Sequence, residues 1–82
     1  MVKVRYHGET DDLIFIDGNV YELKRLRKIG DEYWYVVTDE VGDPSLGTSD
    51  FFEIVEGDID SLPIYEYDEE KGEDVRIKKK DG

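Results

Sequence analysis

Apolar residues at the start of the chain alternate with polar ones at a period of two. Val2, Val4 and Tyr6 are separated by Lys3 and Arg5, and this alternation is typical of a strand that buries one face. Further β-rich runs predict strands at residues 13–16, 20–29, 33–38 and 51–55, with a short piece at 44–47 before the last one. Nowhere do apolar residues recur at helical spacing over the length of a typical helix, so the pattern predicts an all-β domain.

One of these strands, and the turns between strands, carry additional signals. Within residues 20–29, Leu26 is out of phase with Tyr21 and Leu23, which predicts a bulge or a change of face. Residues 48–50 are expected to form one helical turn. Polar runs that contain glycine, aspartate or asparagine predict turns at residues 7–12, 17–19, 30–32 and 39–43.

The last third of the chain differs from the rest in composition. Residues 56–82 are rich in charge and poor in large apolar side chains. Residues 63–67 and 75–78 are β-prone and are expected to pair as a hairpin across 68–74, with the acids of one arm facing the bases of the other. The alternative is a disordered tail. The chain therefore divides into residues 1–55 and an acidic C-terminal extension.

The net charge of −11 on 82 residues is the strongest global signal. Affinity for phosphate backbones comes largely from Lys and Arg that displace counterions, so direct binding to nucleic acid or to an anionic membrane is not expected. The expected partner is a basic protein or peptide, and simple solubility is the alternative meaning of the charge. The basic run at residues 24–28 is expected to neutralise nearby acids, including acids of the C-terminal extension, and to keep a strand edge from pairing with other chains. The alternative is that it contacts nucleic acid or an acidic partner.

The remaining chemistry points away from catalysis. His7 is the only histidine, cysteine is absent, and no acid cluster follows the spacing of a calcium loop. No phosphate-binding glycine loop or nucleophile motif is present, and a small barrel rarely encloses a pocket that tunes paired carboxylates. We therefore expect no enzyme activity, no metal site and no cofactor. The lack of cysteine and of a signal-like or membrane-spanning stretch favours a cytoplasmic protein, expected to be a monomer.

Residues 1–55 resemble SH3 domains in both residue type and spacing. Residues 12–18 are similar to the stretch that leads into the family's diverging turn, and Trp34 with Tyr35 is similar to the paired aromatics of its third strand. A closer likeness is to short, mostly uncharacterised bacterial and phage proteins with this barrel, which share Gly-x-x-Tyr-Glu, Trp-Tyr and Phe-Glu-Ile-Val. The resemblance implies a five-stranded SH3-like barrel over 1–55, to which residues 56–82, a hairpin or flexible tail by their own composition, would be added.

The resemblance also implies a peptide-binding groove. Its aromatic floor would consist of Tyr6, Trp34 and Phe51. Its acidic loop, which pairs with an arginine of a proline-rich ligand, would consist of Glu9, Asp11 and Asp12. The alternatives are that Trp34 covers the barrel end or packs on the C-terminal extension, and that the two aspartates belong to a solvated turn.

The chain departs from the family pattern at several groove positions. Gly8 stands where a second tyrosine is usual, Gly47 replaces a core apolar residue, Thr48 replaces a proline, and Phe51 lacks a hydroxyl. The leading hypothesis is a non-enzymatic protein- or peptide-binding module that uses the aromatic groove and the acidic loop. One alternative is an acidic, phage-type inhibitor that imitates nucleic acid in front of a basic host protein. The other is a structural component of a larger assembly.

Overall fold

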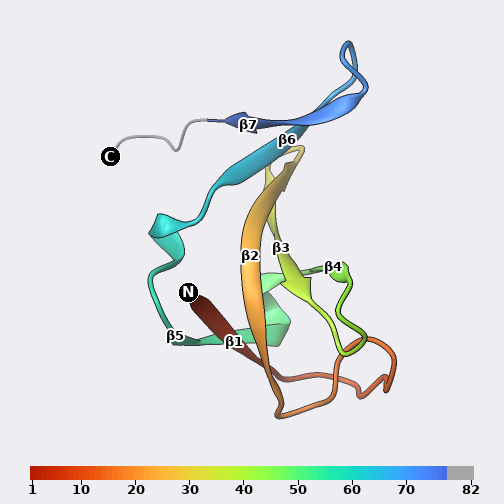
Figure 1. The fold of residues 1–82 in the computed structure, drawn as a ribbon, viewed down its shortest axis with the longest axis vertical. Coiled ribbons are helices and arrows are strands. Elements are labelled where there is room, and N and C mark those ends of the chain that lie inside the picture. The colour runs from red at the N-terminus through yellow and green to blue at the C-terminus, as the bar shows by residue number, and fades with distance from the viewer. Residues whose placement is uncertain (78–82) are drawn as a thin grey trace.

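The computed structural model describes residues 1–77, and their strands form one sheet (Figure 1). The strands are β1 (Val2–Tyr6), β2 (Val20–Ile29), β3 (Glu32–Thr38), β4 (Pro44–Gly47), β5 (Phe52–Glu56), β6 (Ile64–Asp68) and β7 (Glu73–Ile77). Two short 3-10 turns, η1 (Ser49–Phe51) and η2 (Ile59–Ser61), lie before and after β5. The all-β prediction is confirmed, and so is the helical turn expected before β5. No helix in residues 1–77 has the length and apolar character needed to cross a bilayer.

Five strands pair in the order β4-β3-β2-β1-β5, and all four of these pairings are antiparallel. Within the described residues no ladder joins β4 to β5, so the sheet is not closed. The expected closed barrel of five strands is therefore not confirmed. The described part of the chain forms an open sheet to which β6 and β7 are added beside β2.

The long strand β2 is shared by two halves of the sheet. Its first half pairs with β1, and its second half pairs with β3. The register shifts between Leu23 and Arg25, which confirms the predicted bulge. Because of this shift, Leu23 and Leu26 are both buried although they are three positions apart. The turn into β3 is formed by Gly30 and Asp31, with Gly30 at a φ of 62° that suits glycine.

The predicted C-terminal hairpin is present as β6 and β7. β6 runs parallel to β2 and pairs with it from Leu26 to Lys28, and the Leu26 amide donates to the Pro63 carbonyl at 3.0 Å. The expected facing of acids and bases across the hairpin is wrong, because Tyr65 pairs with Arg76 and Asp68 with Glu73. Instead, the acids of the hairpin face the bases of β2, as described below. Residue 78 of the predicted second arm lies outside the described residues.

The core lies between the first half of β2, β1, β3 and β5. Val2, Val4, Leu23 and Val37 are the most completely buried side chains, and aromatic rings complete the cluster. The ring of Phe52 fills the space beside Gly47, where any Cβ would collide with it. The apolar residue expected at position 47 is therefore replaced in the core by an aromatic ring from β5.

Residues 13–16 do not form the strand that their composition predicts. The Asp11 amide donates to the Phe15 carbonyl at 2.7 Å, and the Leu13 amide donates to the Asp11 carboxylate at 3.0 Å. These local bonds replace a ladder, leave Leu13 69% exposed and still place Phe15 in the core. The segment thus delivers one ring to the core from within a turn.

Candidate functional site

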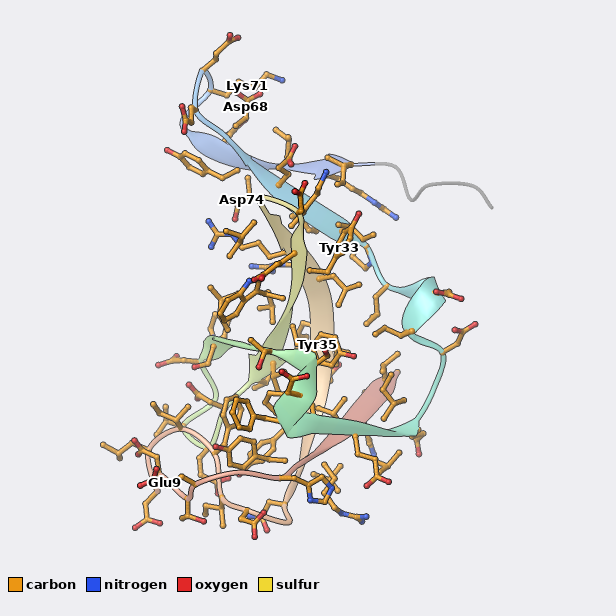
Figure 2. The ribbon with its side chains drawn as sticks, turned by 180° about the vertical axis from the view of Figure 1, so that it is seen from behind. Glu9, Tyr33, Tyr35, Asp68, Lys71 and Asp74 are labelled. Atoms are coloured by element: carbon orange, nitrogen blue, oxygen red, sulfur yellow. The ribbon has the colours of Figure 1, made fainter. Side chains whose placement is uncertain are left out.

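The loop between β1 and β2, residues 7–19, borders a hollow of about 420 Å³, which we call the Tyr6 hollow. The loop returns to β1 because the Tyr6 amide donates to the Asn19 carbonyl and the Gly18 amide donates to the Tyr6 carbonyl. The hollow is lined by two aromatic rings, one aliphatic side chain, two acids and a threonine: Tyr6, Phe15, Ile14, Glu9, Asp11 and Thr10. Glu9, labelled in Figure 2, lies at the outer end of this loop.

Tyr6 sits where the core meets the surface. Its ring centroid lies 5.2 Å from that of Phe15, 5.4 Å from that of Phe52 and 6.5 Å from that of Phe51. Its hydroxyl donates to the Glu9 carbonyl at 2.8 Å. The ring is therefore held at both ends, by aromatic packing and by a hydrogen bond to the loop that it supports.

Phe51 extends the aromatic surface from the Tyr6 hollow onto η1. Its side chain is 49% exposed, and its carbonyl accepts a hydrogen bond from the His7 amide at 2.7 Å. A Cβ on Gly8 would lie 2.6 Å from the Tyr6 hydroxyl oxygen and 3.2 Å from the Phe51 ring. Glycine at position 8 thus permits the close approach of the two rings, in place of the second tyrosine of the family pattern.

Trp34 lies on the other side of η1. Together with Tyr33 and Glu32 from β3 and with residues 48–50, it lines a second hollow of about 290 Å³, the Trp34 hollow. Since η1 supplies Ser49 and Asp50 to this hollow and Phe51 to the rings beside the Tyr6 hollow, the two hollows are neighbours. The structure brings Tyr6 and Phe51 together and places Trp34 in the adjoining hollow, partly buried.

The three acids predicted for the loop have different positions. Glu9 and Asp11 line the Tyr6 hollow, whereas Asp12 is exposed and does not line it. One carboxylate oxygen of Asp11 accepts the Leu13 amide, so the turn is also stabilised by Asp11. No Lys or Arg among residues 1–77 forms an ion pair with Glu9, Asp11 or Asp12. Glu9 and Asp11 thus present negative charge that no described base neutralises.

Tyr21, whose pKa is shifted, packs against Phe15 of the Tyr6 hollow, with ring centroids 5.1 Å apart. Burial, followed by the hydrogen bond that its hydroxyl donates to Glu40, raises the pKa of Tyr21. The same hydroxyl accepts the Ile16 amide at 2.8 Å, and the Glu40 amide donates to the Ile14 carbonyl at 2.8 Å. These bonds tie the β3–β4 turn to the loop behind the Tyr6 hollow.

His7, the only histidine of the chain, lies beside an acid. His7 Nε2 lies 3.1 Å from a carboxylate oxygen of Glu53, and nowhere in residues 1–77 do three or more His, Cys, Asp or Glu side chains converge as ligands would. What the site offers instead is an aromatic surface with unneutralised carboxylates at one end. Such a surface can hold a side chain or a peptide by contact and charge.

The basic run on β2 pairs with the hairpin, as its sequence predicts. Arg27 Nη2 lies 3.4 Å from Asp74 Oδ1, and Lys28 Nζ lies 3.8 Å from Glu66 Oε2. This run also helps to build a third hollow, which no pattern in the sequence predicts. It measures about 300 Å³ and is lined by residues of β2, β3, β4 and β7: Arg25, Arg27, Val36, Pro44, Ser45, Leu46 and Asp74. The one sequence feature that bears on this hollow is the two-residue turn at Gly30 and Asp31. That turn sets the register of β2 and β3, and so sets which β3 residues lie beside the two arginines.

Comparison with models of protein families, with curated proteins and with solved structures found no match to this chain.

Proposed function

We propose that this chain is a non-enzymatic protein-binding domain of the SH3-like type, which captures an extended peptide that carries a basic residue. The observation that carries the proposal is the Tyr6 hollow, where aromatic rings meet two carboxylates that no described base neutralises. The order β4-β3-β2-β1-β5 supports the SH3-like arrangement of residues 1–55.

A lysine or arginine of the partner enters the Tyr6 hollow. Its cation lies near Glu9 and Asp11, both exposed, and its aliphatic stem packs against Tyr6 and Ile14. A cation over a tyrosine ring contributes about 0.5–1 kcal/mol at exposed sites, and each exposed carboxylate about 1 kcal/mol or less. The Tyr6 hollow therefore favours a partner with a positively charged side chain, and the rest of the affinity comes from contacts outside this hollow.

The body of the peptide lies across Phe51 towards the Trp34 hollow. Phe51 is half exposed, and Trp34 lines the next depression along the surface. An extended polyproline II segment places a side chain on the same face at every third residue and is suited to successive aromatic depressions. The net charge of −11 attracts a basic partner and speeds the encounter.

The experiment is a titration of the ¹⁵N-labelled protein with proline-rich peptides that contain one arginine, compared with matched peptides that have glutamine there. The arginine peptides should shift the Trp34 indole signal and the amides of Glu9, Asp11 and Phe51. Phe51→Ala should weaken binding about tenfold, since a half-exposed aromatic anchor is lost. Glu9→Gln combined with Asp11→Asn should abolish the preference for arginine over glutamine; asparagine keeps the oxygen that accepts the Leu13 amide.

Asp31→Asn is the matched control, because it removes an exposed carboxylate in the β2–β3 turn, outside both hollows. It should leave the preference for arginine unchanged. A folded protein whose spectrum does not respond to any arginine peptide would overturn the proposal. Binding to a polybasic protein that salt abolishes and Phe51→Ala leaves intact would favour the acidic inhibitor instead.

A further inference from the structure

The face of the sheet opposite the core carries arginines in an otherwise acidic protein. The β2–β3 register places Arg25 beside Val36 and Arg27 beside Trp34. Side chains of directly paired residues project from the same face of a sheet, so both arginines share a face with Val36 and Trp34. In Figure 2, Asp74, which belongs to this face, and Tyr33, which belongs to the other, lie on opposite sides of the strands.

The third hollow described above lies on this face, and we call it the Arg25–Arg27 hollow. One side of it is cationic, since β2 contributes both arginines. The other side is apolar, because Val36, Pro44 and Leu46 line it from β3 and β4. Val36 is 5% exposed and Leu46 is 43% exposed, so Leu46 is an apolar wall that a ligand can reach.

Both guanidinium groups are held in place without using all of their donors. Arg25 lies over the ring of Tyr65, with its Cζ 5.5 Å from the ring centroid. Arg27 is held by Asp74 through Nη2, while its Nε is buried and has no hydrogen-bond partner in the described part of the chain. A guanidinium has five N–H donors, and a buried donor without a partner is unfavourable. The pair is thus positioned for an acceptor that residues 1–77 do not supply.

We propose that the Arg25–Arg27 hollow binds a carboxylate that carries a short aliphatic chain. A planar carboxylate matches the fork of a guanidinium, and the aliphatic chain packs against Pro44 and Leu46. A volume of about 300 Å³ is at the lower end for ligand sites, which favours a small ligand. A single negative charge is selected because Asp74 stands at the hollow and the whole protein carries −11.

Such a carboxylate has two sources, a free short-chain acid or the C-terminal aliphatic residue of a peptide. The Arg27 Nε–H signal of the ¹⁵N-labelled protein provides the test, because that group is buried and belongs to an arginine that lines the hollow. Hexanoate should shift this signal at concentrations where the same amount of sodium chloride does not. Each methylene that becomes buried tightens binding about fourfold, so hexanoate should bind at least about tenfold more tightly than acetate.

Variants separate a site from general charge attraction. Arg25→Gln should weaken hexanoate about tenfold. Arg76→Gln, which removes the same charge from the paired position beside Tyr65 but does not line the hollow, should change binding less than twofold. Leu46→Ala, an exposed position, should weaken hexanoate and leave acetate unchanged. Equal effects of Arg25→Gln and Arg76→Gln, or a chloride response equal to that of hexanoate, would overturn the proposal.

A final arm identifies the source. A short peptide with a C-terminal leucine should bind more tightly than hexanoate if chain termini are the ligand, and more weakly if free acids are. In both cases the same peptide with an amidated C-terminus should not bind. An amide that binds as well as the free carboxylate would show that the arginines do not recognise the carboxylate, and would overturn the inference.

Discussion

The two ends of β2 are stabilised in different ways. At its first half, β2 is part of an apolar core in which Leu23, Val4 and Phe52 are buried together. At its second half, β2 receives the β6–β7 hairpin through backbone pairing over three residues, from Leu26 to Lys28, and Leu26 is the residue of this half that is buried in the core beside Ile64. Figure 1 shows this hairpin extending from one end of the sheet, away from β1 and β5.

The side-chain contacts of the hairpin with β2 and the core combine a few apolar residues with surface ion pairs. Ile64 is the buried residue that it contributes to the core, while Ile77 packs there only partly buried. The ion pairs of Arg27 with Asp74 and of Lys28 with Glu66 each have side chains about a third exposed or more, and such pairs contribute little stability. The difference teaches that one strand can hold a cooperative core at one end and a weakly attached element at the other.

The largest effect on stability is expected at the first half of β2, which is part of the core. Leu23→Ala should lower the free energy of unfolding by about 2–5 kcal/mol, because Leu23 is 1% exposed and its neighbours relax only partly into the cavity left behind. Urea denaturation followed by tryptophan fluorescence measures this. Val20→Ala, on the same strand but 42% exposed, is the control and should lose less than about 1 kcal/mol. Equal losses would contradict a core centred on this half of β2.

A smaller and more local effect is expected at the hairpin. Ile64→Ala should cost about 2 kcal/mol, the low end for such a truncation, because the partly exposed residues around it can adjust. Hydrogen exchange should accelerate in β6, β7 and at the Leu26 amide, which donates to Pro63, while the amides of β1 stay protected. Ile54→Ala, at a position 38% exposed in β5, is the matched control. Uniform acceleration along the whole sheet would mean that the hairpin and the core unfold as one unit.

Sequence patterns predicted the elements whose information is local. The alternation in residues 2–6, the phase slip at Leu26 and the glycine turns correspond to β1, the β2 bulge and the hairpin turns. Residues 13–16 were predicted wrongly as a strand, because β propensity describes a side chain that suits a half-buried surface and Phe15 meets that requirement from a turn. The carboxylate of Asp11, which caps this turn, was identified only as a site residue.

Long-range pairing was outside the reach of the sequence patterns. The parallel contact of β6 with β2 joins residues far apart in the chain, and no spacing rule sets its register. The charges of residues 24–28 indicated that acids lie nearby, and Asp74 and Glu66 confirm this. They did not indicate that Arg25 and Arg27 share a hollow with Leu46, because that depends on the register of β2, β3 and β4 together. Of the predicted site, the structure groups Tyr6 with Phe51 and Glu9 with Asp11, and it leaves Asp12 outside.

The smallest predicted effect concerns Asp39, a charged residue in the turn between β3 and β4. Asp39 is 9% exposed, and hydrogen bonds from the Ser45 hydroxyl and from the amides of Asp43 and Val41 hold its pKa below the usual value. Because the folded pKa is depressed, the charged form contributes stability above the unfolded pKa near 3.8, and this stability is lost as the pH falls through the folded pKa. At pH 7, Asp39→Asn should therefore have a lower free energy of unfolding than the parent, and the loss should be smaller than the loss caused by Ile64→Ala. This difference between Asp39→Asn and the parent should narrow below about pH 4.

Urea denaturation at several pH values between 2.5 and 7 measures that difference, with Asp31→Asn as the control in the exposed β2–β3 turn. The Asp39 turn also carries Glu40, whose amide holds the Ile14 carbonyl behind the Tyr6 hollow. Loosening the turn should therefore shift the amide signals of residues 11–16 and leave those of β6 and β7 in place. A response confined to the hairpin, or a difference that stays constant with pH, would contradict the role of Asp39, because it would mean that an ionised carboxylate is not what anchors this end of the sheet.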